Sequence, residues 1–134
     1  MADPLFSLEG KVALVTGGSR GLGYQMVKAF AERGADVIIA SRKVEACEEV
    51  AKEVRAMGRK ALAIGAHCGK WDDIDQLIEA AYAEFGRVDI LVNNAGMGPM
   101  VPSYEVPENL FDSVVNLNFK GPYRLAAIIG DRMK

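Results

Sequence analysis

Residues 12–23, VALVTGGSRGLG, decide the fold of this chain. The stretch opens with an apolar run typical of a buried strand, and a turn rich in glycine then leads into an amphipathic segment. Glycines at a strand-to-helix turn allow the backbone to approach a pyrophosphate, and the helix N-terminus offers free N–H groups and partial positive charge. We interpret the stretch as the start of a dinucleotide-binding βαβ unit. The alternative is a glycine turn that serves only close packing of helix on sheet.

Three further apolar runs follow, at residues 37–40, 61–64 and 88–92, and each is interpreted as a buried strand. The segments between the runs carry apolar residues at three- and four-residue steps, the spacing of one-sided helices. Strands that alternate with helices of this length form a parallel sheet with right-handed crossovers. We predict one α/β domain over residues 1–134, a doubly wound, Rossmann-like parallel sheet that is incomplete, with about four strands and four helices.

Glycine and proline mark the ends of the predicted helices. Gly34, Gly58 and Gly86 each follow a helical segment, where a left-handed C-cap suits glycine. Pro107 opens a last helix, which continues toward Lys134 without a C-cap signal. We therefore expect the N-terminal half of a longer fold, in which the fourth strand would be an open sheet edge if nothing covered it.

Composition narrows the possible partners. The chain has 134 residues, 50% of them hydrophobic, and a formal net charge of -2 with scattered basic residues. This pattern argues against nucleic acid and an anionic membrane as partners. Cys47 and Cys68 lack the spacing of a redox or zinc site, and the N-terminus lacks a basic segment followed by an apolar run. We expect a cytoplasmic protein with reduced thiols and no metal site.

The residues after the second predicted strand select the cofactor. NAD-binding proteins carry an acidic residue there, about 20 residues past the glycines, that holds the ribose 2′-hydroxyl. This chain has Ser41-Arg42-Lys43 instead. Guanidinium groups at Arg42 and Arg20 can clamp a 2′-phosphate through charge-assisted hydrogen bonds. The residues therefore favour NADP(H), and the alternative is that Arg42 and Lys43 are only solvated charges.

Three motifs together suggest a family. With TGGSRGLG at residues 16–23, Asn93-Asn94-Ala95-Gly96 after the fourth predicted strand and Asn118 in the next helix, the chain resembles the short-chain dehydrogenase/reductase family over its whole length. The resemblance implies hydride transfer between a nicotinamide and a small-molecule carbonyl or alcohol substrate, in a homo-oligomer. It implies that the cofactor is bound by Gly17, Ser19, Arg20, Gly21, Leu22, Gly23, Ser41, Arg42, Cys68, Asn94, Ala95 and Gly96.

The resemblance also concerns the catalytic residues. Asn118 matches the asparagine that holds a water in the family's proton relay, while the catalytic serine and Tyr-x-x-x-Lys pair would follow a fifth strand that this sequence does not contain. Tyr24 and Lys28 have the Tyr-x-x-x-Lys spacing, but they follow the glycine turn directly and belong to the phosphate-binding element. The alternatives to an oxidoreductase half are a stand-alone dinucleotide-binding module and an inactive truncation that needs a partner.

The end of the third predicted strand departs from the family, which usually has an aspartate beside the adenine. This chain has His67-Cys68-Gly69 there. The main chain of Cys68 could still face the adenine, but the carboxylate acceptor that the family's aspartate supplies is missing. Catalysis by His67 is disfavoured so far from the nicotinamide, and a satisfied hydrogen bond is the simpler role. We interpret the Cys68 side chain as a small buried hydrophobe rather than a nucleophile.

The last predicted helix carries apolar residues at positions 111, 115, 119 and 123, which could form an oligomer face or pack on the sheet. The apolar loop over residues 97–100 hints at a largely apolar substrate.

Overall fold

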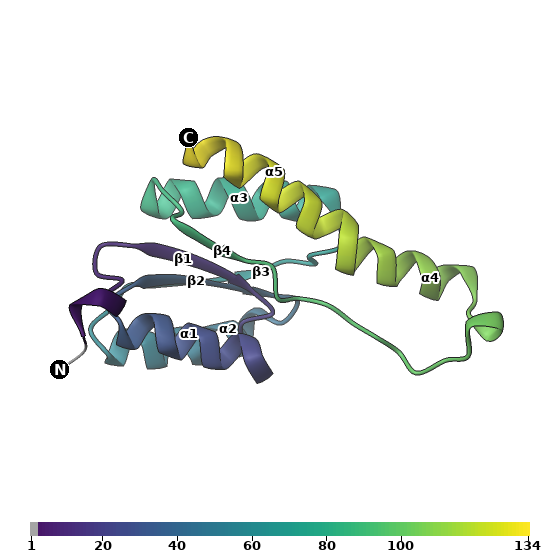
Figure 1. The fold of residues 1–134 in the computed structure, drawn as a ribbon, viewed down its shortest axis with the longest axis horizontal. Helices are drawn as coiled ribbons and strands as arrows, with labels where there is room; N and C mark the ends of the chain where they lie inside the picture. The colour runs from purple at the N-terminus through teal and green to yellow at the C-terminus, as the bar shows by residue number, and fades with distance from the viewer. Residues whose placement is uncertain (1–2) are drawn as a thin grey trace.

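The computed structural model describes residues 3–134, which form a parallel sheet with helices on both faces (Figure 1). The strands are β1 (Val12–Thr16), β2 (Asp36–Ser41), β3 (Ala61–Gly65) and β4 (Ile90–Val92). The helices are α1 (Gly21–Glu32), α2 (Val44–Ala56), α3 (Trp71–Phe85), α4 (Glu108–Val115) and α5 (Gly121–Met133). The remaining helical turns are η1 (Pro4–Phe6), η2 (Ser103–Glu105) and the π-helical η3 (Asn116–Lys120). The predicted Rossmann-like α/β fold is confirmed.

The sheet has the strand order β3-β2-β1-β4, and every neighbouring pair is parallel. In register, Val15 of β1 lies beside Ile39 of β2 and Val92 of β4. The chain winds outward from β1 to β3 and then crosses back to place β4 on the other side of β1. In doubly wound sheets, ligands bind outside the carboxyl ends of the strands at such a reversal. The topology therefore predicts a ligand site at the carboxyl ends of β1 and β4.

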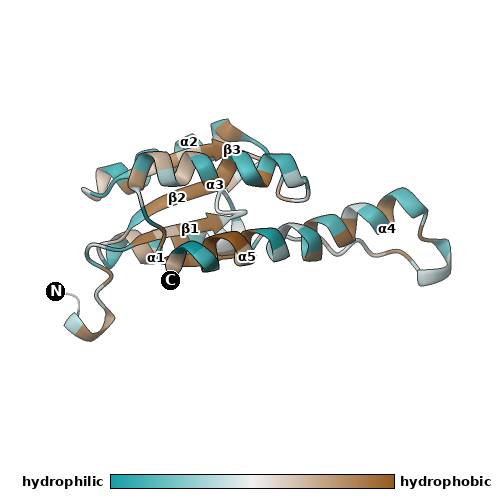
Figure 2. Cartoon of the chain, turned by 90° about the horizontal axis from the view of Figure 1, so that it is seen from above, coloured by the Kyte–Doolittle hydropathy of each residue, from teal (hydrophilic) through white to brown (hydrophobic). Residues whose placement is uncertain are grey.

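Two apolar layers cover the sheet, with α1 and α2 on one face and α3 and α5 on the other (Figure 1). Leu14 and Ile38 belong to the cluster that includes side chains of α3 and α5. Val15 and Ile39, the next residues along the two strands, belong to the cluster with α1 and α2. Because both faces are covered, the central strands read as continuous apolar runs, brown in Figure 2.

Strand β4 begins at Ile90, two residues later than predicted. The reason is Asp89, whose carboxylate Oδ2 accepts a hydrogen bond from the N–H of Val12 at 2.9 Å. A side chain therefore occupies the place of a main-chain acceptor at the start of the ladder. Among residues 3–134, β4 is a sheet edge, as expected.

The last helical segment is not the single regular helix that the pattern predicted. It consists of α4, the π-helical turn η3 and α5 in succession. Pro122 has no N–H to donate to the carbonyl of Asn118, its α-helical acceptor, so regular α-helical bonding cannot continue through this turn. Figures 1 and 2 show α4 and the loop before it extending beyond the sheet.

The predicted glycine caps are confirmed, because Gly34, Gly58 and Gly86 have φ angles of +102°, +82° and +71°. Cys47 and Cys68 are buried free thiols. Within the described range, no helix combines the length and the apolar character that crossing a bilayer requires. Residues 3–134 also hold no cluster of three or more His, Cys, Asp or Glu side chains that could bind a metal ion.

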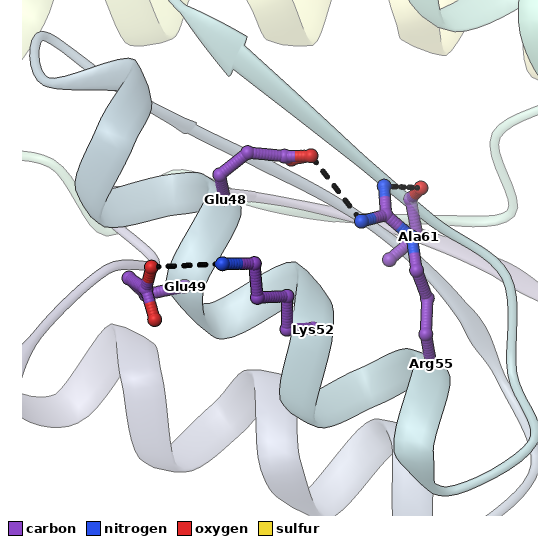
Figure 3. Close-up of polar contacts among 5 residues, drawn as sticks. All are labelled: Glu48, Glu49, Lys52, Arg55 and Ala61. Carbon is purple, nitrogen blue, oxygen red and sulfur yellow. Dashed lines mark hydrogen bonds and ion pairs between the residues drawn. The ribbon is translucent and has the colours of Figure 1, made fainter.

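A polar network ties α2 to β3 (Figure 3). Arg55 donates one hydrogen bond to Glu48 and another to the main-chain carbonyl of Ala61 at 3.0 Å. Lys52 pairs with Glu49 one turn away on the same helix. Exposed ion pairs of this kind contribute about 0–1 kcal/mol each to the free energy of folding. The pairs therefore add little stability, and the contact between Arg55 and Ala61 serves to align α2 with the edge strand β3.

Candidate functional site

A cavity of about 480 Å³ lies at the carboxyl ends of the strands. Its walls come from the turns after all four strands and from α4 and η3. They are formed by Gly17, Ser19, Arg20, Gly21, Ser41, Arg42, Ala66, His67, Cys68, Asn94, Ala95, Gly96, Met97, Ser113 and Leu117. The walls include no aspartate or glutamate, so an anionic ligand meets no carboxylate there.

The glycine turn brings the N-terminus of α1 against the end of β1. A Cβ on Gly23 would lie 2.1 Å from the carbonyl oxygen of Gly17, so no larger residue fits at position 23. Gly17 and Gly21 have φ angles of +64° and +59°, which only glycine adopts without strain. Arg20, the N-cap of α1, makes no side-chain capping bond. The first N–H groups of α1 are therefore available to an anion, and glycines leave room for it to approach the backbone.

The turn after β4 is locked to the turn after β1. The Thr16 hydroxyl accepts hydrogen bonds from the N–H groups of Asn94 and Ala95, both at 3.0 Å, and donates to the carbonyl of Val92 at 3.4 Å. The Asn94 side chain donates to the carbonyl of Gly17 at 3.1 Å. These bonds span more than 70 residues of sequence and hold two walls of the cavity at a fixed separation.

The end of β2 adds positive charge to the cavity. Arg42 and Arg20 both line it, and neither guanidinium forms a hydrogen bond or ion pair with another of residues 3–134. Ser41 accepts a hydrogen bond from Ser19 at 3.4 Å and lies 3.0 Å from the sulfur of Cys47. Burial raises the pKa of the Cys47 thiol, so Ser41 is held beside a neutral group. The uncompensated charge at this end suits a phosphate.

The end of β3 contributes His67 and Cys68. The main-chain N–H of His67 donates to the Asp73 carboxylate at 2.8 Å, and its ring Nδ1 accepts from the N–H of Gly69 at 3.1 Å. The expected hydrogen bond of this histidine is thus present. Cys68 is 5% exposed, and burial raises its pKa to about 11. The thiol is therefore protonated at neutral pH. It behaves as a buried apolar group and not as a nucleophile.

Three of the predicted site residues lie outside the cavity walls. Leu22 is 74% exposed, and Gly23 lies buried behind Gly17. Asn118 holds the loop after β4, since its Oδ1 accepts from the N–H of Met97 at 2.9 Å and its Nδ2 donates to the carbonyl of Met97 at 2.7 Å.

The other ten predicted cofactor residues all line the cavity. Sequence reasoning did not include the other five lining residues among the site residues: Ala66, His67, Met97, Ser113 and Leu117. Ser113 and Leu117 come from α4 and η3, and no sequence spacing shows that this segment lies over the strand ends.

Tyr24 and Lys28 do not reach the cavity. Tyr24 donates a hydrogen bond to Glu53 of α2 at 2.7 Å, and Lys28 lies 5.6 Å from the centre of its ring. The hydrogen bond to Glu53 raises the pKa of Tyr24, whereas a tyrosine that acts as a base at neutral pH needs a lowered pKa. The pair is structural despite its spacing.

A family model described as short chain dehydrogenase matches residues 11–134. The chain belongs to this family. It is 45% identical to 2-dehydro-3-deoxy-D-gluconate 5-dehydrogenase of Escherichia coli over 118 residues, which is 88% of this chain and 46% of that protein. The chain thus spans about half the length of the curated relatives it matches.

Solved structures of relatives carry both nicotinamide cofactors. A metagenomic short-chain oxidoreductase in complex with NADP has a TM-score of 0.90 and 34% identity, over 94% of this chain and 57% of that one. A 3-ketoacyl-(acyl-carrier-protein) reductase from Brucella melitensis, complexed with NADH, has a TM-score of 0.85 and 44% identity, over 92% of this chain and 50% of that one. Family membership alone therefore does not choose between the two cofactors.

Proposed function

We propose that this chain binds NADP(H) in the cavity and forms the cofactor-binding part of an oxidoreductase that acts on a small-molecule carbonyl or alcohol. One observation carries the proposal: Arg20 and Arg42, unpaired among residues 3–134, line the cavity next to the uncapped N-terminus of α1, and no carboxylate lines it. Two anionic groups of the cofactor, a pyrophosphate and a 2′-phosphate, need this combination.

The residues divide into roles by position. The turn from Gly17 to Gly23 takes the pyrophosphate, with Ser19 and Arg20 in the turn and Leu22 in the first turn of α1 nearest to it. Ser41 and Arg42, with Arg20 opposite, bind the 2′-phosphate on the adenosine ribose. Cys68 contributes its main chain, because its thiol is buried. The loop that includes Asn94, Ala95 and Gly96 forms the wall on the β4 side.

Selection of NADP(H) over NAD(H) follows from charge. An acidic residue at the end of β2 would bind a ribose hydroxyl and repel a phosphate. The guanidinium of Arg42 does the reverse, and hydrogen bonds to charged groups contribute about 1.5–3 kcal/mol each. Among the relatives described above, both cofactors are represented, so this residue is the basis of the choice.

The nicotinamide, when bound, gives or accepts the hydride. The chain's own part in the chemistry is to hold the cofactor and to shape the loop over it. Asn118 fixes that loop through Met97, and its main-chain carbonyl, which Pro122 cannot bond, is the group we assign to hold a water of the proton relay. The serine and the tyrosine-lysine pair that complete proton transfer come, in this proposal, from outside residues 1–134.

The exposed faces of Phe111, Phe119 and Tyr123 support a further part of the proposal, a homo-oligomer. These side chains are 60%, 69% and 61% exposed, so they do not pack on the sheet. A cytoplasmic location agrees with two reduced cysteines and remains part of the same proposal.

Calorimetric titration with NADPH and NADH tests the proposal, with Arg42→Ala as the key variant. We expect the substitution to weaken NADPH binding by about tenfold or more and NADH binding by less than about twofold. Lys52→Ala is the matched control, because it removes the same charge from the exposed face of α2. Failure of the wild-type protein to bind NADPH, or equal losses for both cofactors in Arg42→Ala, would overturn the proposal.

A further inference from the structure

The order of the strands fixes which end of a bound dinucleotide lies against β3. The glycine turn follows β1, and the residues assigned to the ribose phosphate follow β2. A ligand that runs from the first turn past the second continues toward the end of β3, on the side away from β4. The residues of the cavity wall at that end are Ala66, His67 and Cys68. This placement rests on the proposed function, and it sets the purine beside His67.

A hydrogen bond holds the neutral ring of His67 in one tautomer. Its Nδ1 accepts a hydrogen bond from the N–H of Gly69, and a main-chain N–H can only donate, so Nδ1 carries no proton. The proton of the neutral imidazole is then on Nε2. Position 69 is closely packed against this ring, since a Cβ there would lie 3.1 Å from Cε1 of His67. Among residues 3–134, Nε2 has no hydrogen-bond partner.

No acceptor side chain competes with this donor. The carboxylate of Asp73 already accepts the main-chain N–H of His67 at 2.8 Å. The Cys68 thiol is turned to the carbonyl of Ala66, with the sulfur 3.9 Å from the oxygen. The cavity walls contain no acidic residue. His67 lines the purine end of the cavity, and its Nε2–H is a donor that no other residue among 3–134 uses.

We propose that His67 is a specificity residue for the purine of the dinucleotide and that it reads the purine through donation from Nε2–H. The edge of adenine carries ring-nitrogen acceptors and a 6-amino donor. A donor on the protein pairs with a ring nitrogen and gains nothing from the amino group. It pairs equally with the 6-oxo group of hypoxanthine. The cavity thus accepts a 6-oxopurine dinucleotide far more readily than a cavity with a carboxylate at position 67 would.

Binding of NADPH and of its hypoxanthine analogue, reduced nicotinamide hypoxanthine dinucleotide phosphate, tests this inference. The measured quantity is the ratio of the two dissociation constants, analogue over NADPH. We expect His67→Asp to raise this ratio at least fivefold over the wild-type value, because a carboxylate accepts from the 6-amino group and repels the 6-oxo group. Arg42→Ala is the control, since it weakens both ligands and leaves the ratio within twofold of the wild-type value.

The wild-type protein provides a second readout that needs no substitution. His67 is the single histidine of the chain, so its two ring nitrogens can be assigned without ambiguity by ¹⁵N NMR. At pH 8 we expect the Nε2–H tautomer, with an Nε2 resonance that shifts when NADPH saturates the protein. An Nδ1–H tautomer, an unshifted Nε2 resonance, or an unchanged ratio in a folded His67→Asp variant would overturn the inference while NADPH binding stands. Absence of NADPH binding would instead remove the proposed function, and this inference with it.

Discussion

The hydroxyl of Thr16 is the residue-scale link between the core and the cavity. It is 1% exposed and contacts three main-chain groups of the segment from Val92 to Ala95. A buried N–H that loses its acceptor costs about 1–3 kcal/mol, so the two N–H groups held here make this hydroxyl important for stability. Because the same N–H groups lie in the cavity wall, Thr16 also sets the width of the site.

Thr16→Val keeps the shape of the side chain and removes the acceptor. We expect the free energy of unfolding in urea to fall by roughly 2–6 kcal/mol, twice the cost of one unsatisfied N–H group. Thr16→Ser keeps the hydroxyl and loses one methyl group, so its loss should be about 1 kcal/mol. Equal losses for the two variants would show that the methyl group, and not the hydrogen bonds, stabilises this turn.

At the scale of elements, α5 is held against the end of β3 by a contact that only glycine permits. A Cβ on Gly121 would lie 1.7 Å from the carbonyl oxygen of Cys68. A Cβ on Gly130 of the same helix would have nothing within 4 Å, and this glycine has no positive φ. The two glycines therefore have opposite roles, since one allows close approach and the other only lowers helix propensity.

Alanine at these two positions separates the roles. Gly121→Ala should destabilise the protein by roughly 1–3 kcal/mol or more, because α5 must move away from Cys68. Gly130→Ala should stabilise it by about 0.5–1 kcal/mol through helix propensity alone. Thermal or urea unfolding of both variants measures these effects. Similar stabilities for the two variants would mean that α5 does not rest on the end of β3.

The start of β4 depends on the ionised form of Asp89. A hydrogen bond from Arg87 holds the pKa of Asp89 below its ordinary value, burial opposes this effect, and the N–H of Val12 adds to the lowering. A carboxyl with a lowered folded pKa contributes stability that is fully present above the unfolded pKa, about 3.9, and is lost as pH falls through the folded pKa.

We expect Asp89→Asn to be less stable than the wild-type protein at pH 6, with the difference shrinking as the pH falls below about 4. Urea unfolding from pH 6 to pH 3 measures the difference. A difference that stays constant over this range would show that the charge of Asp89 does not support the β1–β4 pair.

Sequence patterns predicted the elements well where one physical cause dominates. Apolar runs marked β1, β2 and β3, and glycines with positive φ marked the helix ends. The start of β4 was placed too early, because a side-chain acceptor at Asp89 is invisible to hydrophobic patterning. The π-helical turn was missed because the apolar spacing runs through it, although Pro122 was the available signal.

The site was predictable in its phosphate-binding turn and less so elsewhere. The glycines at fixed positions and Arg42 at a strand end can be recognised from their neighbours in the sequence alone. Ser113 and Leu117 reach the cavity only because the last helical segment lies over the strand ends, which is a tertiary effect. The bond between Thr16 and the turn after β4 joins residues far apart in sequence and has no local signal.

At the scale of the whole molecule, the last helical segment presents a row of exposed apolar side chains. Phe111, Val115, Phe119 and Tyr123 recur at four-residue spacing across α4, η3 and α5, and all are at least one third exposed. Exposed aromatic side chains grouped on one face mark contact sites more often than isolated ones do. We expect this face to join copies of the protein.

Phe119→Glu places a charge in the middle of that face and should convert the oligomer to a monomer in sedimentation velocity experiments. Leu5→Glu is the control, because Leu5 is 81% exposed and lies in the N-terminal turn, outside this row. The control should keep the wild-type sedimentation coefficient. A monomeric wild-type protein, or an oligomer that survives Phe119→Glu, would contradict the assignment of the face.

A crystal structure of the protein with NADP⁺ tests the central claim, that the cavity at the strand ends is an NADP(H) site, most directly. We expect the pyrophosphate at the N-terminus of α1 and the 2′-phosphate within hydrogen-bond distance of Arg42. A dinucleotide bound elsewhere, or a 2′-phosphate that contacts only solvent, would contradict the claim.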